Sequence, residues 1–93
     1  MPISYDPAKQ ARTLVERGLD FEDAPEVFAG PVATMSDLRK DYGEPRFVTE
    51  GHLEGRFVVI VWTPRGERMH VISMRYGHGK EERRFQARLG RSG

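Results

Sequence analysis

The chain has 93 residues, of which 38% are hydrophobic and 31% charged, and it contains no cysteine. This composition predicts a globular protein with one domain over residues 1–93, and the lack of cysteine excludes disulfides, thiolate metal sites and cysteine nucleophiles. No apolar run approaches the roughly 20 residues that cross a bilayer, and the N-terminus lacks the pattern of a signal peptide. We therefore expect a cytoplasmic protein.

Helices are predicted in the first part of the chain, after a short strand at residues 3–5. Asp6 followed by Pro7 is typical of a helix start and Gly18 of a helix end, so a helix is expected over about residues 7–17. Four apolar side chains share one face of it: Ala8, Ala11, Leu14 and Val15. A second helix should end near residues 29–30, and Pro25 should distort its first turn or keep it short because proline lacks a backbone donor.

The spacing changes to that of strands from Pro31 onward. The expected elements are strands at residues 32–35, 46–52, 57–62 and 68–76, turns at 53–55 and 64–67, a loop at 36–45 and a helix at about 80–89. The unbroken apolar run Phe57–Trp62 predicts a central strand that is covered on both faces. The predicted fold class is α+β, with two N-terminal helices, an antiparallel sheet of about four strands and a C-terminal helix.

Charge is divided unevenly along the chain. Residues 1–45 carry five basic and nine acidic side chains, a net charge of −4, whereas residues 46–93 carry ten basic and five acidic ones, a net charge of +5. Such separation within a small domain favours a polyanionic partner, RNA or DNA above all. The alternative is a charged face that is merely solvated.

Several short segments, in order and spacing, resemble the BrnT family, the ribonuclease toxins of BrnT/BrnA-type toxin–antitoxin pairs. The segments are Tyr5-Asp6 with Lys9, Gly18 to Ala24, Val27-Phe28 with Pro31, Arg46-Phe47 with Gly51, Val58 to Val61, Arg65 to Arg68, Ile72 to Arg75, and Glu82 to Arg84. The chain departs from the family pattern at Glu16 and Arg17, where Lys-His is common, and at His70, where arginine is usual.

This resemblance implies a RelE-like fold, ribonuclease activity that arrests translation, and neutralisation by a BrnA-like antitoxin with a ribbon-helix-helix DNA-binding domain. Promoter DNA would be bound only through the antitoxin complex. Neither a cofactor nor a metal is expected, since the histidines lack metal-binding spacing and cysteine is missing. Two alternatives of other classes remain: a nucleic-acid-binding module that cuts nothing, and a degenerate toxin that acts only as a partner in a repressor complex.

Metal-free RNA cleavage needs proton-transfer groups and cations that stabilise charge on the phosphate. His70 titrates near neutrality, and RelE-like folds are known for using Lys and Arg in such sites, so the catalytic candidates are Arg75, His70 and Lys9. The RNA-binding candidates are Arg46, Arg68, His78, Lys80, Arg83 and Arg84. Arg75 is expected to bind the phosphate, the alternative being a salt bridge to Glu81 or Glu82.

Strand geometry separates two of these candidates. Side chains alternate between the faces of a strand, so Arg75 and His70 are expected on opposite faces unless the strand is twisted or bulged. For His70 the alternative is a surface histidine without a catalytic role.

Overall fold

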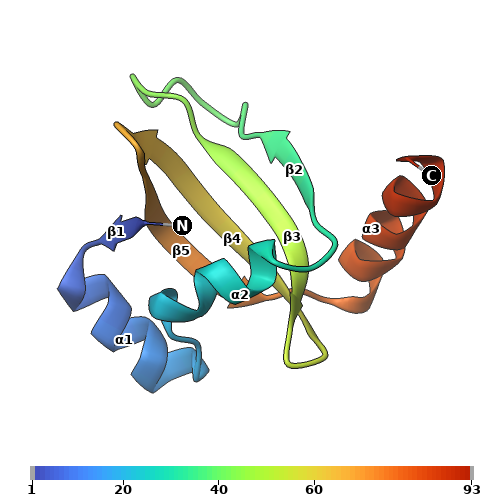
Figure 1. Ribbon diagram of the computed structural model, residues 1–93, viewed down its shortest axis with the longest axis horizontal. Helices are drawn as coiled ribbons and strands as arrows, with labels where there is room; N and C mark the ends of the chain where they lie inside the picture. The colour runs from blue at the N-terminus through green and yellow to red at the C-terminus, as the bar shows by residue number, and fades with distance from the viewer. Residues whose placement is uncertain (1, 93) are drawn as a thin grey trace.

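The structure is a computed structural model, and it describes residues 2–92. Its elements in chain order are β1 (Ile3–Tyr5), α1 (Pro7–Arg17), a 3₁₀ turn (Phe21–Asp23), α2 (Ala24–Phe28), β2 (Ala33–Ser36), β3 (Phe47–Leu53), β4 (Arg56–Arg65), β5 (Arg68–Tyr76) and α3 (Gly79–Ser92). The five strands form one sheet in the order β1-β5-β4-β3-β2 (Figure 1). The α+β class predicted from the sequence is confirmed.

The sheet is larger than the predicted four antiparallel strands, because β1 adds a fifth at its edge. β1 pairs in parallel with β5, and its Ile3 and Tyr5 lie opposite Met69 and Val71. All other neighbouring strands are antiparallel. The sequence predicts a strand at residues 3–5 but not its neighbour, since the two strands are more than 60 residues apart in the chain.

The first helix begins and ends as the sequence predicts. The Asp6 carboxylate accepts a hydrogen bond from the Ala8 backbone N–H at 2.9 Å and caps α1, and Gly18 ends the helix with a φ of 70°. The second helix is short and distorted around Pro25, as expected, with a 3₁₀ turn leading into α2. The apolar face of α1 stays largely uncovered, however: Leu14 is 45% exposed and Val15 86%.

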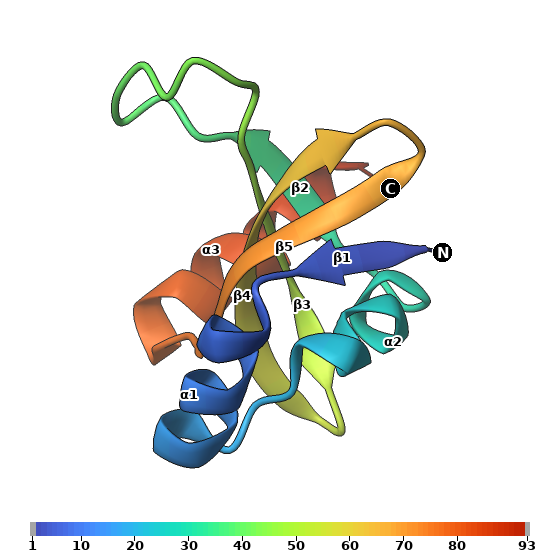
Figure 2. The same ribbon diagram turned by 90° about the vertical axis from the view of Figure 1, so that its left-hand side faces the viewer.

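α2 and α3 lie on opposite sides of the sheet (Figure 2), which therefore has an α2 face and an α3 face. The α2 face holds the larger core, with nine buried residues: Leu19, Phe21, Ala24, Val27, Val58, Ile60, Met69, Val71 and Met74. On the α3 face the buried cluster consists of Phe57, Val59 and Phe85. β4 contributes to both clusters, which confirms the prediction of a central strand covered on both faces.

A bulge in β5 changes which side chains share a face. Val61 pairs with Ser73, but Trp62 pairs with Val71, which leaves Ile72 as the extra residue. Val71 and Met74 consequently both lie in the α2-face core although regular alternation would separate them.

The expectation that Arg75 and His70 lie on opposite faces is therefore wrong. Arg75 pairs with Val59 and His70 with Thr63, two positions of β4 that point to the same side. Both candidates face the side of the sheet on which α3 lies, one from each end of β5.

Candidate functional site

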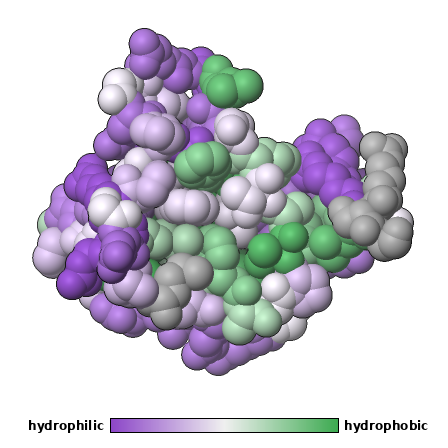
Figure 3. All heavy atoms as spheres, turned by 45° about the horizontal axis from the view of Figure 1, so that its top comes forward, coloured by the Kyte–Doolittle hydropathy of each residue, from purple (hydrophilic) through white to green (hydrophobic). Residues whose placement is uncertain are grey.

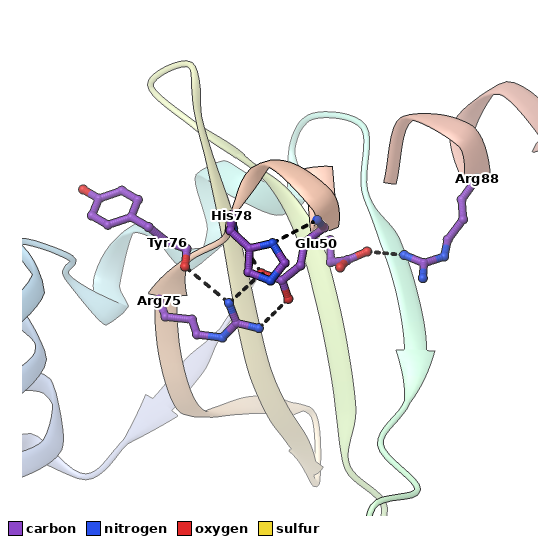
Figure 4. A network of polar contacts seen from close by, with 6 residues as sticks. Glu50, Arg75, Tyr76, His78 and Arg88 are labelled. Carbon is purple, nitrogen blue, oxygen red and sulfur yellow. Dashed lines mark hydrogen bonds and ion pairs between the residues drawn. The ribbon is translucent and has the colours of Figure 1, made fainter. Parts of the chain in front are cut away.

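The α3 face carries a group of polar contacts, which centre on Arg75 at the end of β5 (Figure 4). Arg75 is the last but one residue of β5, and its guanidinium meets the carboxylate of Glu81 in the first turn of α3. Nη1 lies 2.9 Å from Oε1 and Nη2 lies 2.7 Å from Oε2. The salt bridge considered as an alternative for Arg75 is therefore present.

This pairing still leaves one side of the Arg75 guanidinium open. Nη1 also donates to the Tyr76 carbonyl at 3.3 Å, so Glu81 and Tyr76 together occupy three of the five N–H donors. Among residues 2–90, no acceptor reaches Nε–H or the second hydrogen of Nη2, and the side chain is 44% exposed. Arg75 is thus held in place while it presents one planar fork, the geometry that matches phosphate or carboxylate oxygens.

Glu81 connects this arginine to the start of α3. The hydrogen bonds from Arg75 lower the pKa of Glu81 to about 2, helped by the backbone N–H of His78 and opposed by burial. The pKa of Arg75 is raised in turn, chiefly by its hydrogen bonds to Glu81. Both groups are consequently charged at neutral pH.

His78 forms a reciprocal cap with the same carboxylate. Its backbone N–H donates to Glu81 Oε1 at 3.1 Å, and its Nδ1 accepts from the Glu81 backbone N–H at 3.3 Å. This is the pattern of a capping box with imidazole in the place of a hydroxyl group. An accepting Nδ1 assigns the proton of neutral His78 to Nε2, on a side chain that is 64% exposed.

Three cations continue the site along the outer side of α3. Lys80, Arg83 and Arg84 are exposed, and with Ala87 they line a shallow recess of about 450 Å³. Within the part of the chain that the structure describes, no carboxylate pairs with any of the three. The structure therefore brings together five predicted residues: Arg75, His78, Lys80, Arg83 and Arg84.

The two other catalytic candidates lie elsewhere. His70 is four ladder positions from Arg75, about 13 Å along the strand at 3.3 Å per residue. Its Nδ1 is 2.9 Å from the Ser4 hydroxyl, and burial, followed by the charge of Arg65, lowers its pKa. Lys9 lies on α1 beside Arg12 and Arg17, in a recess against Ile72 and Ser73.

Arg68 and Arg46 are not part of the cluster either. Arg68 stands at the turn between β4 and β5, opposite Arg65, and its Nη1 is 3.4 Å from the Ile3 carbonyl. Arg46 stacks on the ring of Tyr42, with its guanidinium carbon 3.9 Å from the ring centroid. Its Nε is buried and makes no hydrogen bond with any residue that the structure describes.

Sequence reasoning missed a second pair beneath α3. Glu50 is 6% exposed and binds Arg88, which ties the C-terminal half of α3 to β3 (Figure 4). It shares a row with Arg75, because both pair with Val59. The sequence signal for this pair is Glu50 itself, a charged residue within a strand, since a buried carboxylate is almost always paired.

Arg17, one of the departures from the family pattern, also has a position of its own. Its Nη1 donates to the Met74 carbonyl at 2.8 Å, beside Arg75. The guanidinium thus fixes the end of α1 against β5.

Among the described residues, no group of three or more His, Asp or Glu side chains is placed to hold a metal ion. None of their helices is long and apolar enough to cross a membrane.

The fold and site together define a small α+β protein that presents a fixed arginine and a row of unpaired cations on one face of its sheet. Residues 5–81 match the model of a family described as the ribonuclease toxin, BrnT, of type II toxin–antitoxin systems. The chain belongs to this family, so it is a ribonuclease toxin whose partner is a cognate antitoxin. No curated protein matches the chain.

Proposed function

We propose that the toxin cleaves RNA internally and without a metal ion, at the end of β5 where Arg75 presents its open fork. The observation that supports this is the arginine held by Glu81 and Tyr76, since a donor fixed in advance needs no reorganisation when charge develops on the phosphate. Lys80, Arg83 and Arg84 lie on the outer side of α3 within one helical turn of Glu81, and they would extend the cationic surface along the RNA backbone.

In the proposed reaction the ribose 2′-oxygen attacks the neighbouring phosphorus and gives its proton to a water molecule, while the bond from phosphorus to the 5′-oxygen breaks and that oxygen takes up a proton. Arg75 binds the phosphate oxygens. The backbone N–H of His78 binds the same Glu81 oxygen as Arg75, which places the His78 ring beside the fork. In its protonated form, in which Nδ1 no longer accepts from the Glu81 N–H, His78 donates a proton to the departing oxygen. His70 lies about 13 Å along the sheet from Arg75, and Lys9 lies on α1 against Ile72 and Ser73, so these two candidates would act on neighbouring parts of the RNA.

The biological setting follows from the family. We infer that cleavage arrests translation in the cytoplasm, that the antitoxin is a BrnA-like ribbon-helix-helix protein, and that promoter DNA is bound only through the complex of the two. What supports this is the membership in a type II toxin–antitoxin family.

The test is cleavage of purified RNA in EDTA by the wild type and by two arginine variants. Arg75→Ala should slow cleavage by about 100- to 1,000-fold, as loss of one preorganised donor does. Arg68→Ala is the matched control, because Arg68 is an exposed arginine at the other end of the same strand. It should change affinity at most, not the rate at saturating RNA.

Each other outcome has a distinct meaning. Wild-type cleavage by a folded Arg75→Ala variant would contradict the proposed site and point to Arg68 or Arg83. RNA that is retarded intact by the wild type would indicate a binding module, and neither binding nor cleavage would indicate a toxin that acts only as a partner. Cleavage that appears only when Mg²⁺ is added would contradict the metal-free mechanism.

A further inference from the structure

A second arginine is held in the same way as Arg75, in the loop between β2 and β3. Asp37 is buried there, with its side chain 1% exposed, and it accepts from Nε and Nη2 of Arg39 at 2.8 Å each. These bonds lower the pKa of Asp37 to about 2, so the pair is fully ionised at neutral pH. Arg39 itself is 72% exposed, and no carboxylate or carbonyl oxygen among residues 2–90 accepts from its Nη1, although the Tyr42 hydroxyl also interacts with the guanidinium.

The two arginines flank one groove on the α3 face, beyond the part of the sheet that α3 covers. The groove has a volume of about 300 Å³. Its apolar lining consists of Met35, Leu38, Val48, Val59 and Val61. The positive charges of Arg39 and Arg75 are close enough to influence each other, since Arg39 lowers the pKa of Arg75 against the larger effect of Glu81.

One apolar side chain stands at the rim of this groove without cover. Leu38 is 86% exposed, in a loop that is otherwise mostly hydrophilic. Figure 3 shows apolar surface on this projecting loop, separate from the apolar area in the middle of the view. An exposed aliphatic side chain beside fixed arginines fits a protein-binding surface, because the buried centre of such a surface is more apolar than its rim and arginine is enriched there.

An arginine fork can bind the phosphates of RNA or the carboxylates of a peptide, and the residues that line the groove favour the peptide. Single-stranded RNA is held by stacking its bases on aromatic side chains, and none of the residues that line the groove is aromatic. An aliphatic floor between two open forks complements a peptide segment that places an apolar side chain between two carboxylates.

We propose that this groove binds a segment of the antitoxin that carries an apolar anchor flanked by acidic side chains. The inference deepens the proposed function, because it rests on the toxin–antitoxin partnership and assigns the surface that the partner covers. A carboxylate on the open fork of Arg75 takes the position of the RNA phosphate. The antitoxin then neutralises the toxin by occupying the phosphate site directly.

The test measures the affinity of the full-length toxin for its co-purified cognate antitoxin, using Leu38→Glu and Val15→Glu. The two side chains are equally exposed, at 86% each, so neither substitution disturbs the fold, and Val15 lies on α1 away from the groove. Leu38→Glu removes the apolar anchor contact and adds a charge that repels acidic side chains. It should weaken the complex at least tenfold, whereas Val15→Glu should leave it unchanged.

RNA cleavage by the free toxin is measured on the same variants. Leu38→Glu should cleave saturating RNA at the wild-type rate, because Leu38 stands at the rim of the groove whereas the phosphate is bound by the open fork of Arg75. Unchanged antitoxin affinity in Leu38→Glu would overturn the inference, and so would a complex that only Val15→Glu weakens, since the antitoxin would then dock on α1. Loss of RNA cleavage with full antitoxin affinity in Leu38→Glu would assign the groove to RNA instead.

Two outcomes distinguish a failure of this inference from a failure of the proposed function. If the wild type leaves RNA uncut but Leu38→Glu alone weakens the antitoxin complex, the groove is confirmed and the proposed cleavage site is wrong. If Arg75→Ala abolishes cleavage while Leu38→Glu binds antitoxin normally, the cleavage site stands and the groove does not.

Discussion

The two faces of the sheet are built by different interactions. The apolar cluster of the α2 face has nine buried residues, and Thr49 is buried on the same face. The apolar cluster of the α3 face has three, and α3 is attached to this face by Phe85 together with the ion pairs Arg75–Glu81 and Arg88–Glu50 and the polar contact between His52 and Glu82.

The α2 face therefore stabilises the fold, whereas the α3 face presents charged side chains. Apolar burial is worth about 25 cal/mol per Å², so the α2 face supplies most of the stabilisation. Ion pairs with partly exposed members add little to the free energy of unfolding, but they fix the direction of each guanidinium. The α3 face can therefore hold arginines ready for a ligand without being essential to the sheet.

The largest expected effect comes from removing one large side chain from each face. Phe21→Ala should lower the free energy of unfolding by about 3–5 kcal/mol, because Phe21 is fully buried in the α2-face core. Phe85→Ala, equally buried in the smaller cluster, should release α3 and leave the strands folded. Denaturant unfolding with hydrogen exchange measures both, and loss of protection throughout β4 in Phe85→Ala would contradict the division.

The next effect concerns the cations that face outward from α3. Replacing Lys80, Arg83 and Arg84 by alanine removes three unpaired charges. The slope of log affinity for single-stranded RNA against log salt should fall by about 2, at about 0.7 for each phosphate contact. Filter binding across a salt series measures it, with Lys40→Ala in the exposed loop as the control. An unchanged slope would place the RNA on another surface.

A smaller effect is expected from pH through Glu81. Its pKa lies at about 2 in the folded protein against a usual 4.5, so its pairing stabilises the fold above about pH 4.5 and this contribution is lost as the pH falls towards 2. Glu81→Gln removes it, at a cost on the order of 1–2 kcal/mol at neutral pH because Arg75 is partly solvated.

Thermal unfolding between pH 2 and pH 7 checks this prediction. The stability of the wild type should fall more steeply than that of Glu81→Gln over the acidic part of the range. Asp37, whose pKa is also about 2, contributes equally to both proteins and cancels in the comparison. Parallel curves would show that Glu81 does not hold Arg75 in solution.

The smallest effect is predicted for the contact between His52 and Glu82, which links α3 to the C-terminal end of β3. The His52 Nε2 lies 2.9 Å from Glu82 Oε2, and the two side chains are 32% and 43% exposed. Glu82→Gln should cost less than about 1 kcal/mol and leave RNA cleavage unchanged. A larger loss of stability, seen in the same denaturant experiment, would mean that polar contacts hold α3 more firmly than Phe85 does.

The sequence by itself determined where most elements begin and end. Asp6, Pro7 and Gly18 bound α1 because capping and left-handed conformations depend on local residue chemistry, and the run Phe57–Trp62 marks the buried strand because both its faces need apolar cover. The order and spacing of short segments also identified the family.

Tertiary structure alone decided the arrangement of the site. The bulge at Ile72 places Arg75 and His70 on one face, and an extra residue in a ladder depends on how two strands pair, not on the residue type. The sequence left Glu81 and Glu82 open as salt-bridge partners of Arg75, and the turn at Gly77 selects Glu81 and adds the Tyr76 carbonyl. The pairing of Asp37 with Arg39 became known only when the loop after β2 was placed. Which fork of an arginine stays open is set by the distance and angle of every neighbouring acceptor, and those are properties of the folded chain.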